Sequence, residues 1–545
     1  MGRREIGARL VAAAVFAGFC AAPARAAGAA AAAPAGMSVS AISAEAEATA
    51  VSTADVETRF TAGETVVRVP LETLVQVAVA RNLSFLSSEA ALANARYGAK
   101  ADVAAFDPVF SANYSQSHIG QRVVYTPGII PGESYSNSQT TSFEIAKNTT
   151  IGTQLSLTAQ NQRTQENSTS PTQPLFGSSL ILGITQPLLQ GFGRAAAFAA
   201  AKIAQEGGDA ALAASKRILQ QTVAAVESSY WTLRQDENNE AVTLKSLRIA
   251  EKIMRQNQEL NKLNLLSAHD ALTSEEQVEI LRTSYLETVR TREDDADNLI
   301  FLCYGAQVQE LLDNERYTVG TATGAPAAVP NLPSLGQAVA LALNLRPDVA
   351  QARSILAEQD ASLAQAKNAL LPQLNFTGTL ASGGSNQSGD PGALNDAITG
   401  ALHGRDHAWS VGGAFSIPIG DRIYIDKYRA AEAAREQAML SLAGTENTVR
   451  FDVRSAMRGV ETESLRYQVA QDAARLSWKQ FEQEQARMRL GLTDSFRVLQ
   501  SQDLALQAEE SLNGVQLALA QAEINYRLAV GTIAKQYMAD LKDVK

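Results

Sequence analysis

Lys262-Leu263-Asn264-Leu265-Leu266-Ser267 and, later in the chain, Arg489-Leu490-Gly491-Leu492-Thr493-Asp494 are two versions of one short run. Each run separates two long stretches in which Gly and Pro are almost absent. Gly491 in the second run stands where the first has Asn264, and Gly and Asn are the residues that most readily adopt the left-handed backbone just past a helix end. The pair therefore predicts two tight turns, each joining one long helix to another.

The stretches before these turns are too long for an ordinary globular core. Residues 194–263 and 422–490 would each span roughly 100 Å at a rise of 1.5 Å per residue. After the second turn, apolar residues follow steps of three and four, which is coiled-coil spacing; they are Leu512, Val515, Leu519, Ala522 and Tyr526. We expect long helices packed along narrow apolar seams.

The rest of the chain repeats around these turns. Similar helical openings occur at residues 71–83 and 335–347, and each precedes a helical stretch that ends before a proline, Pro108 or Pro372. Proline ends a helix because it lacks the backbone donor. A β-like region, a long helix, the turn and a last helix follow in each copy. We predict repeats at residues 64–320 and 321–535 and a C-terminal tail at 536–545.

The β-like regions alternate between apolar and small polar residues. An apolar face opposite a small polar face is typical of an outer-membrane barrel strand, although a half-buried sheet of a soluble domain alternates in the same way. Because a membrane barrel needs about eight strands or more, several chains must combine to close one. The second repeat offers two strands, at residues 373–382 and 407–418. The first offers two to four, at residues 109–118, 142–147, 152–161 and 176–187.

The first β-like region is longer than the second, and its surplus contains a predicted tight turn at residues 149–153. Either each chain contributes an extra hairpin to the barrel, or the surplus forms an elaborated external loop. We favour the external or rim hairpin. We also expect the Gly-rich segment at residues 382–386 to be a loop between two strands.

The N-terminus has the features of a secretory signal peptide. Arg3, Arg4 and Arg9 precede an apolar stretch, and Ala24-Arg25-Ala26 fits the small-x-small rule for cleavage. We predict a signal peptide at residues 1–26 and a mobile lead at residues 27–63, which lacks bulky side chains. Phe19 before Cys20 disfavours a lipid anchor, and Cys303 is expected to be a small core residue.

Charge and motifs exclude several classes of protein. A net charge of −10 argues against nucleic acid as a partner. His403 and His407 have a ligand spacing, but Gly404 lies between them, so we expect two exposed loop histidines and no metal site. Motifs for phosphate binding, nucleophilic catalysis or zinc are missing from the sequence. We therefore predict no catalytic residues, no cofactor and no enzyme activity.

The twofold order of helices, strand pairs and long helical hairpins resembles that of the TolC-like outer-membrane efflux and secretion channels over residues 65–535. The resemblance implies a mainly α-helical fold with a membrane β-barrel: a long α-helical barrel continuous with an outer-membrane β-barrel assembled across a homotrimer, with two tandem repeats per chain. It also implies a place in the cell outer membrane, contact with its lipid, and a large periplasmic part. The implied partners are a periplasmic adaptor (membrane fusion protein) and an inner-membrane pump.

The resemblance further implies passive passage of substrates from a tripartite efflux pump or a type I secretion system. The tip where the adaptor docks would then consist of the two turns, namely Leu263, Asn264, Leu265, Leu490, Gly491, Leu492 and Thr493. The periplasmic entrance would lie at Asp270, Thr273, Asp494, Arg497 and Gln500.

This chain departs from the pattern of the family at the entrance. The positions of the family's gate carboxylates hold Arg497 and Gln500, which suggests that the acidic gate is absent or moved to Asp494. Met488 stands in place of a tip tyrosine. Arg497 and Asp270 are expected either to pair across helices or to be two separately solvated charges. The alternative function is a structural coiled-coil envelope protein without a pore, and the sequence does not identify the cargo.

Overall fold

The computed structural model describes residues 65–122, 133–167, 173–305, 317–321, 332–387, 392–420 and 422–537. The predicted signal peptide and lead lie outside the described residues, as does the tail beyond residue 537. The described chain divides into two compact units. The first, here called the sheet unit, comprises residues 96–207 and 355–438, and the second, the helical unit, comprises the remainder. Each unit therefore draws on both sequence repeats.

The sheet unit contains one six-stranded sheet in the order β2-β3-β4-β5-β7-β8. All neighbours are antiparallel. Both predicted strands of the second repeat, and all four of the first, are confirmed, although most extend further than predicted. The strands are β2 (Val109–Arg122), β3 (Glu133–Asn148), β4 (Gln154–Asn167), β5 (Leu175–Pro187), β7 (Gln373–Gln387) and β8 (Asp406–Ser416).

One row of large apolar side chains crosses this whole sheet on a single face. In register, each residue of the row pairs with the next; the members are Phe110, Ile145, Leu157, Leu182, Leu380 and Trp409. The neighbouring row, on the opposite face because successive side chains alternate, contains small residues, among them Ser156, Gly183, Thr379 and Ser410. The alternation of apolar and small residues in the sequence thus continues across the complete sheet, from strand to strand.

The expectation of an external hairpin in the first repeat is wrong. Strands β3 and β4 lie between β2 and β5 and pair along their length on both sides. The predicted tight turn is present, with Thr149 N–H donating to the Thr153 carbonyl at 2.8 Å. This turn contacts the segment after β5, because Gly193 N–H donates to the Ile151 carbonyl at 3.1 Å. The surplus sequence therefore widens the sheet.

The expected loop at residues 382–386 is also corrected, because this segment belongs to β7. A ten-residue helix, α12 (Ala393–Leu402), follows the strand and packs on β7 and β5. It covers Gly384, where an added Cβ would meet the Ala397 carbonyl oxygen at 2.3 Å. The glycines of this segment thus allow close approach of a helix. His403 is the C-cap of α12, and His407 lies in β8.

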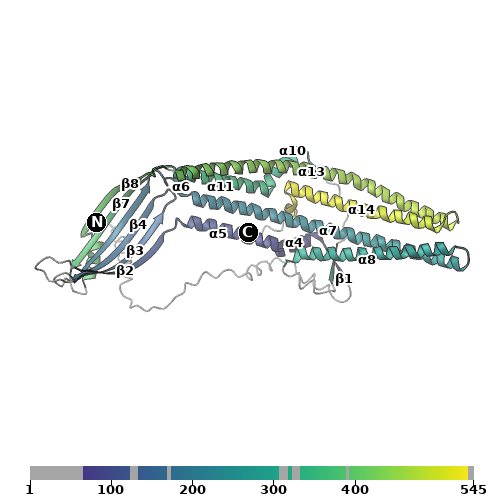
Figure 1. The fold of residues 1–545 in the computed structure, drawn as a ribbon, viewed down its shortest axis with the longest axis horizontal. Helices are drawn as coiled ribbons and strands as arrows, with labels where there is room; N and C mark the ends of the chain where they lie inside the picture. The colour runs from purple at the N-terminus through teal and green to yellow at the C-terminus, as the bar shows by residue number, and fades with distance from the viewer. Residues whose placement is uncertain are drawn as a thin grey trace, which may run out of the picture. The chain divides into compact units, whose positions relative to one another are not determined.

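The helices repeat in the same order in both halves of the chain (Figure 1). Two short parallel strands, β1 (Thr65–Val69) and β6 (Tyr317–Thr321), precede the helices of each half. The helices that end before Pro108 and Pro372 confirm the predicted proline stops. The first half has α4 (Leu71–Arg81), α5 (Leu83–Ala104), α6 (Arg194–Ala197), α7 (Ala199–Lys262) and α8 (Ala268–Tyr304). The second has α10 (Leu335–Leu345), α11 (Pro347–Ala369), α13 (Arg422–Arg489), α14 (Ser495–Val530) and the 3-10 turn η2 (Ile533–Gln536).

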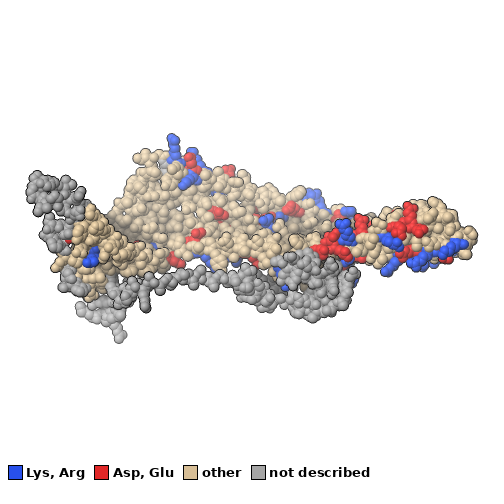
Figure 2. Space-filling view, turned by 60° about the horizontal axis from the view of Figure 1, so that its bottom comes forward, with Lys and Arg blue, Asp and Glu red and all other residues tan. Residues whose placement is uncertain are grey.

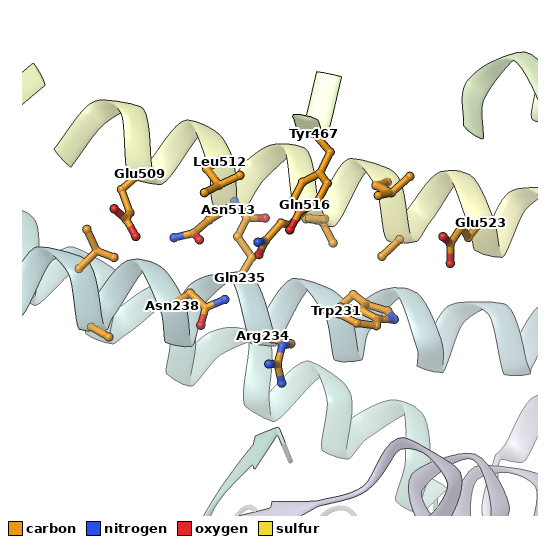
Figure 3. Close-up of a pocket in the computed structure, with 15 residues that line it drawn as sticks. Trp231, Arg234, Gln235, Asn238, Tyr467, Glu509, Leu512, Asn513, Gln516 and Glu523 are labelled. Carbon is orange, nitrogen blue, oxygen red and sulfur yellow. The ribbon is translucent and has the colours of Figure 1, made fainter. Parts of the chain in front are cut away.

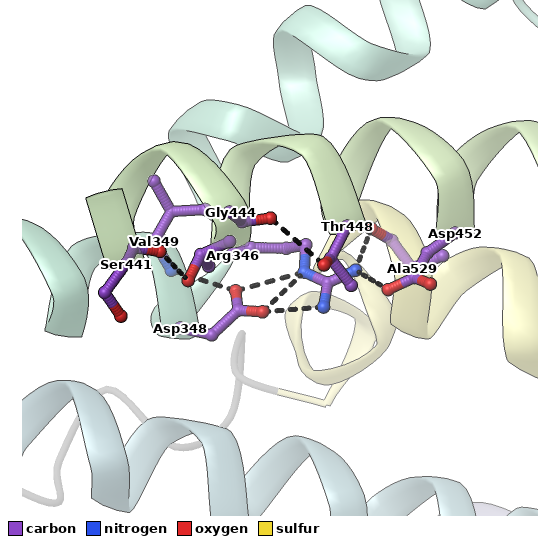
Figure 4. Close-up of polar contacts among 9 residues, drawn as sticks. Arg346, Asp348, Val349, Ser441, Gly444, Thr448, Asp452 and Ala529 are labelled. Atoms are coloured by element: carbon purple, nitrogen blue, oxygen red, sulfur yellow. Dashed lines mark hydrogen bonds and ion pairs between the residues drawn. The ribbon is translucent and has the colours of Figure 1, made fainter. Parts of the chain in front are cut away.

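Arg346, between α10 and α11, connects three helices of the helical unit (Figure 4). Its guanidinium donates to Asp348 at 2.6 Å, to Asp452 of α13 at 2.9 Å and to the Ala529 carbonyl of α14 at 3.5 Å. Two carboxylates around one half-buried Arg form charge-assisted hydrogen bonds, which are stronger than neutral ones. These bonds connect the start of the second repeat, at Arg346, to its end, at Ala529.

Cys303 is fully buried, as predicted, in the core cluster that joins α4, α7, α8 and η2. Burial raises the pKa of its thiol to about 12, which keeps the sulfur in its apolar, protonated form. Among the described helices, none is both long and apolar enough to cross a membrane.

Candidate docking surface at the helical hairpins

Two helical hairpins end together in the helical unit, α7–α8 and α13–α14 (Figure 1). Both turns have the same backbone geometry. Asn264 has φ 55° and Gly491 has φ 71°, so the predicted left-handed residues are confirmed. Leu265 N–H donates to the Leu260 carbonyl at 2.9 Å, and Leu492 N–H donates to the Arg487 carbonyl at 3.0 Å. This is the Schellman pattern, which satisfies carbonyls at a helix end.

Side-chain caps start the helix after each turn. The Ser267 hydroxyl accepts from Asp270 N–H at 3.2 Å, and the Asp494 carboxylate accepts from Arg497 N–H at 2.9 Å. Such caps satisfy orphan donors, and a carboxylate at this position is further stabilised by the helix dipole. Asp494, the residue to which the acidic gate was expected to have moved, therefore holds the first turn of α14.

Four leucines at the turns point into solvent. Their exposed fractions lie between 65% and 74%; they are Leu263, Leu265, Leu490 and Leu492. Leu272 and Phe496, near the starts of the following helices, are exposed as well. We call these six residues the leucine tip. Clustered exposed apolar side chains on a soluble surface mark interaction sites more often than isolated ones do.

The remaining predicted entrance residues lie around this tip without joining into one cluster. Arg497 and Gln500 are exposed on α14, and Asp270 is half-buried on α8. Within the described part of the chain, the ion pairs do not include one between Asp270 and Arg497, so the two are separate charges in a single copy. Thr273 donates its hydroxyl proton to the His269 carbonyl at 3.0 Å, and Thr493 is half-buried in the second turn.

A buried core holds the two hairpins against each other. It combines residues of all four helices, among them Ile253, Val278, Phe481 and Val498. Gln502 of α14 donates to the Ser246 carbonyl of α7 at 2.6 Å. This core therefore fixes the two hairpins against each other, and the exposed side chains of the leucine tip are not part of it.

Two hollows in the helical unit could not be predicted from the sequence. One, of about 380 Å³, lies beside the tip and is lined by His269, Leu272, Thr273, Glu275, Glu276 and Glu279. The other, of about 360 Å³, lies farther from the turns and is lined by residues of α7, α13 and α14, including Trp231, Tyr467 and Glu523 (Figure 3). Burial raises the pKa of Glu523, and Glu227 adds to the shift while Arg527 opposes it.

The surface around the hairpin end carries charges of both signs (Figure 2). Near the tip, several of them form local pairs along one helix, such as Lys262 with Glu259 at 2.7 Å and Arg487 with Glu484 at 3.0 Å. An exposed pair such as Lys262 with Glu259 contributes little to stability. The effect of these charges is to surround the apolar tip with a polar rim, which is the usual anatomy of a protein interface.

Comparison with known proteins finds a family similarity in the second repeat. Residues 338–532 match the family described as outer membrane efflux protein. This segment of the chain is similar to members of that family. The family is a class of outer-membrane channels and not a class of enzymes, and its members reside in the cell outer membrane with a large periplasmic part.

Curated relatives include two proteins of Pseudomonas putida, the probable efflux pump outer membrane protein TtgC and the antibiotic efflux pump outer membrane protein ArpC. Each is 21% identical over 312 residues, which is 57% of this chain. The match spans 60% of the length of these relatives.

Solved structures extend the similarity of fold to both repeats. The outer membrane channel CmeC of Campylobacter jejuni has a TM-score of 0.61 at 17% identity, covering 87% of this chain and 89% of CmeC. The MtrE channel of Neisseria gonorrhoeae, solved in an open state, has a TM-score of 0.60 at 16% identity, covering 85% and 88%. The chain therefore has the fold of the TolC-like channels.

Proposed function

We propose that this chain is one subunit of a homotrimeric outer-membrane channel that passes substrates from a tripartite efflux pump to the exterior. The observation that carries the proposal is the combination of two surfaces in one chain. One is a sheet with a continuous apolar row on one face and small residues on the other, which suits lipid outside and water inside. The other is the exposed leucine tip.

Passage through such a channel is passive in this proposal, because the chain has no residue set for energy transduction or catalysis among its predicted sites. Energy would come from the inner-membrane pump. The names of the curated relatives, which are components of efflux pumps, support efflux over the type I secretion system that the sequence left open. The cargo is not part of the proposal.

The adaptor would dock on the leucine tip and on the acidic hollow beside it. Leu272 belongs to both surfaces, and the hollow adds Glu275, Glu276 and Glu279. An adaptor surface that combines apolar and basic side chains would bury the leucines and neutralise these carboxylates. The periplasmic entrance would remain at Asp270, Thr273, Asp494, Arg497 and Gln500, close to the docked adaptor.

The test of channel function uses the full mature chain purified in detergent. We expect native mass spectrometry to give a trimer and planar bilayers to show single-channel conductance. Extraction as a soluble protein without detergent, together with no conductance, would contradict the proposal and favour a structural coiled-coil envelope protein.

The test of docking uses the double variant Leu265→Glu/Leu492→Glu. Introducing two charges into the apolar tip should abolish binding to the periplasmic adaptor of the same pump, while trimer mass and conductance stay unchanged. The matched control, Leu265→Met/Leu492→Met, keeps the apolar surface and should bind normally. Unchanged binding of the Glu variant would show that the adaptor docks elsewhere.

A further inference from the structure

The hollow of about 360 Å³ in the helical unit has an elongated lining (Figure 3). Along α14 the lining extends from Glu509 to Glu523, and along α7 it extends from Trp231 to Val242. At a rise of 1.5 Å per residue these helical segments are about 21 Å and about 17 Å long. Because the volume is spread over that length, the hollow has room for a slender ligand and not for a compact one.

A carboxylate lies at each end of the α14 lining, and neither is neutralised by a cation of the hollow itself. The Oε1 atom of Glu523 is buried and has no hydrogen-bond partner among the described residues. Burial raises the pKa of Glu523, and Arg527, which donates to Glu227, opposes the shift only in part. Among the described residues that line the hollow, Arg234 is the one cation, and its side chain points away from α14 (Figure 3).

Amide and aromatic side chains line the hollow between the two carboxylates. Amide carbonyl oxygens accept hydrogen bonds from ammonium groups, and aromatic faces attract cations at short range. Trp231 of α7 and Tyr467 of α13 supply the aromatic faces (Figure 3). The amides come from α7 and α14 and are Gln235, Asn238, Asn513 and Gln516. The whole lining therefore suits a ligand that is positively charged at both ends and along its length.

We propose that this hollow binds a linear polyamine such as spermine, extended parallel to α7 and α14. Its terminal ammonium groups pair with Glu509 and Glu523, and its inner ammonium groups donate to the amide oxygens. The methylene segments between them pack on Trp231 and Tyr467. A plain alkyl chain fits the shape but leaves the carboxylates and amides without partners.

A ligand in this hollow contacts α7, α13 and α14 at the same time. It therefore connects the α7–α8 hairpin to the α13–α14 hairpin above the core that already joins them. A ligand that binds the folded protein and not the unfolded chain stabilises the folded state. Spermine should accordingly raise the Tm of the helical unit, and this effect does not depend on the channel function proposed above.

Calorimetric titration of the full mature protein in detergent, with spermine as the probe, tests the site. Glu509→Gln/Glu523→Gln keeps the shape of the lining, and the new amide oxygen can still accept from Trp478, which Glu509 does here. We expect the Kd for spermine to rise about tenfold or more and the increase in Tm to disappear. The matched control, Glu461→Gln/Glu482→Gln, removes two exposed carboxylates of α13 outside the hollow and should bind normally.

A second variant keeps both carboxylates and fills the space instead. Ala241 lines the hollow, so Ala241→Met should also weaken binding of spermine. Circular dichroism and native mass spectrometry show whether each variant keeps its fold and its assembly. Putrescine, a shorter diamine that reaches one carboxylate at a time, should bind the natural protein more weakly than spermine and lose less affinity in the Gln variant.

Two outcomes would overturn the inference. If the Gln variant and Ala241→Met both bind spermine as tightly as the control variant does, the hollow is not the site. If Mg²⁺ at the same ionic strength displaces spermine as well as unlabelled spermine does, the binding is only accumulation of counterions on an acidic surface. Either outcome leaves the proposed channel standing, because conductance is measured without the polyamine.

Discussion

At the scale of single residues, Asn264 and Gly491 are different residues that meet the same backbone requirement at the two turns. Both have positive φ and both place the next N–H on a carbonyl five residues back. This feature could be predicted from the sequence because left-handed backbone is a local demand that few residues meet. The exposure of Leu265 or Phe496 could not, since it depends on which helices pack behind the turns.

Asn264→Ala should weaken the first turn, whereas Asn264→Gly should not. A left-handed backbone costs an alanine about 1 kcal/mol or more, and glycine adopts it freely. Hydrogen exchange of the amides at residues 260–268 should therefore be several-fold faster in the alanine variant. Gly491→Ala makes the equivalent change at the second turn and should weaken that turn in the same way. Equal exchange protection in all variants would show that the left-handed backbone does not limit the stability of the turns.

Asp236 in α7 is a residue whose charge depends on pH within the physiological range. Burial raises its pKa to about 7, and hydrogen bonding with Asp295 of α8 and repulsion by it add to the shift. The folded protein thus binds a proton that the unfolded chain, with a normal aspartate, has lost. Stability is highest below the unfolded pKa near 4 and falls as pH rises to about 7.

Asp236→Asn should therefore abolish this part of the pH dependence. The amide is neutral at every pH, so at pH 8 the free energy of unfolding of the variant should exceed that of the natural protein by roughly 1–2 kcal/mol. This is less than the full pKa shift would give, because Asp236 and Asp295 share one proton. At pH 4.5 the two should be alike. The midpoints of chemical unfolding at pH 4.5 and pH 8 give the measurement. A stability difference between the two proteins that is the same at both pH values would contradict the role of Asp236.

At the scale of elements, helix α12 shows where local reasoning fails. The Gly-rich segment at residues 382–386 has the composition of a loop, yet it continues β7 because α12 lies against it. Gly384 contributes no Cβ, and the Ser382 hydroxyl donates to the Ala401 carbonyl. Only tertiary packing distinguishes a glycine that bends a chain from one that admits a neighbour.

Gly384→Ala should displace α12 from the sheet. The new Cβ would lie 2.3 Å from the Ala397 carbonyl oxygen and 2.7 Å from the Ala401 nitrogen, both backbone atoms that cannot move alone. We expect a cost of about 1–3 kcal/mol and loss of exchange protection at residues 393–402. Gly392→Ala is the control, because nothing lies within 4 Å of its added Cβ. Retained protection in Gly384→Ala would contradict the close contact.

At the scale of the whole chain, the repeats are units of sequence and not of packing. The order of helices and the proline stops follow from local pattern and were predictable, but the sheet and the helical unit each combine both repeats. The place of the β3–β4 hairpin illustrates the limit, because period-two alternation predicts strands without saying which strands pair. Only the pairing register, which links Phe110 in β2 through each strand to Trp409 in β8, shows that the strands form one sheet.

Glu227 of α7 connects the first repeat to the end of the second. It is fully buried and accepts from Arg527 of α14, with Nη1 to Oε1 at 3.3 Å, and from the Tyr537 hydroxyl at 3.0 Å. A buried carboxylate is stable only with such partners, so removing one leaves an uncompensated charge. Burial, together with the negative charge of Glu227, also raises the pKa of Tyr537, which keeps its hydroxyl a donor.

Arg527→Leu alone should therefore lower the free energy of unfolding by about 3 kcal/mol or more, the usual cost of breaking a buried ion pair from one side. In Glu227→Gln/Arg527→Leu the stranded charge is gone, and most of that stability should return, because a neutral amide can still accept from Tyr537. Denaturant unfolding of the detergent-solubilised variants gives the comparison. If the double variant were as unstable as the single one, the loss would lie in the packing of the Arg527 stem, and the link between the repeats would be apolar rather than ionic.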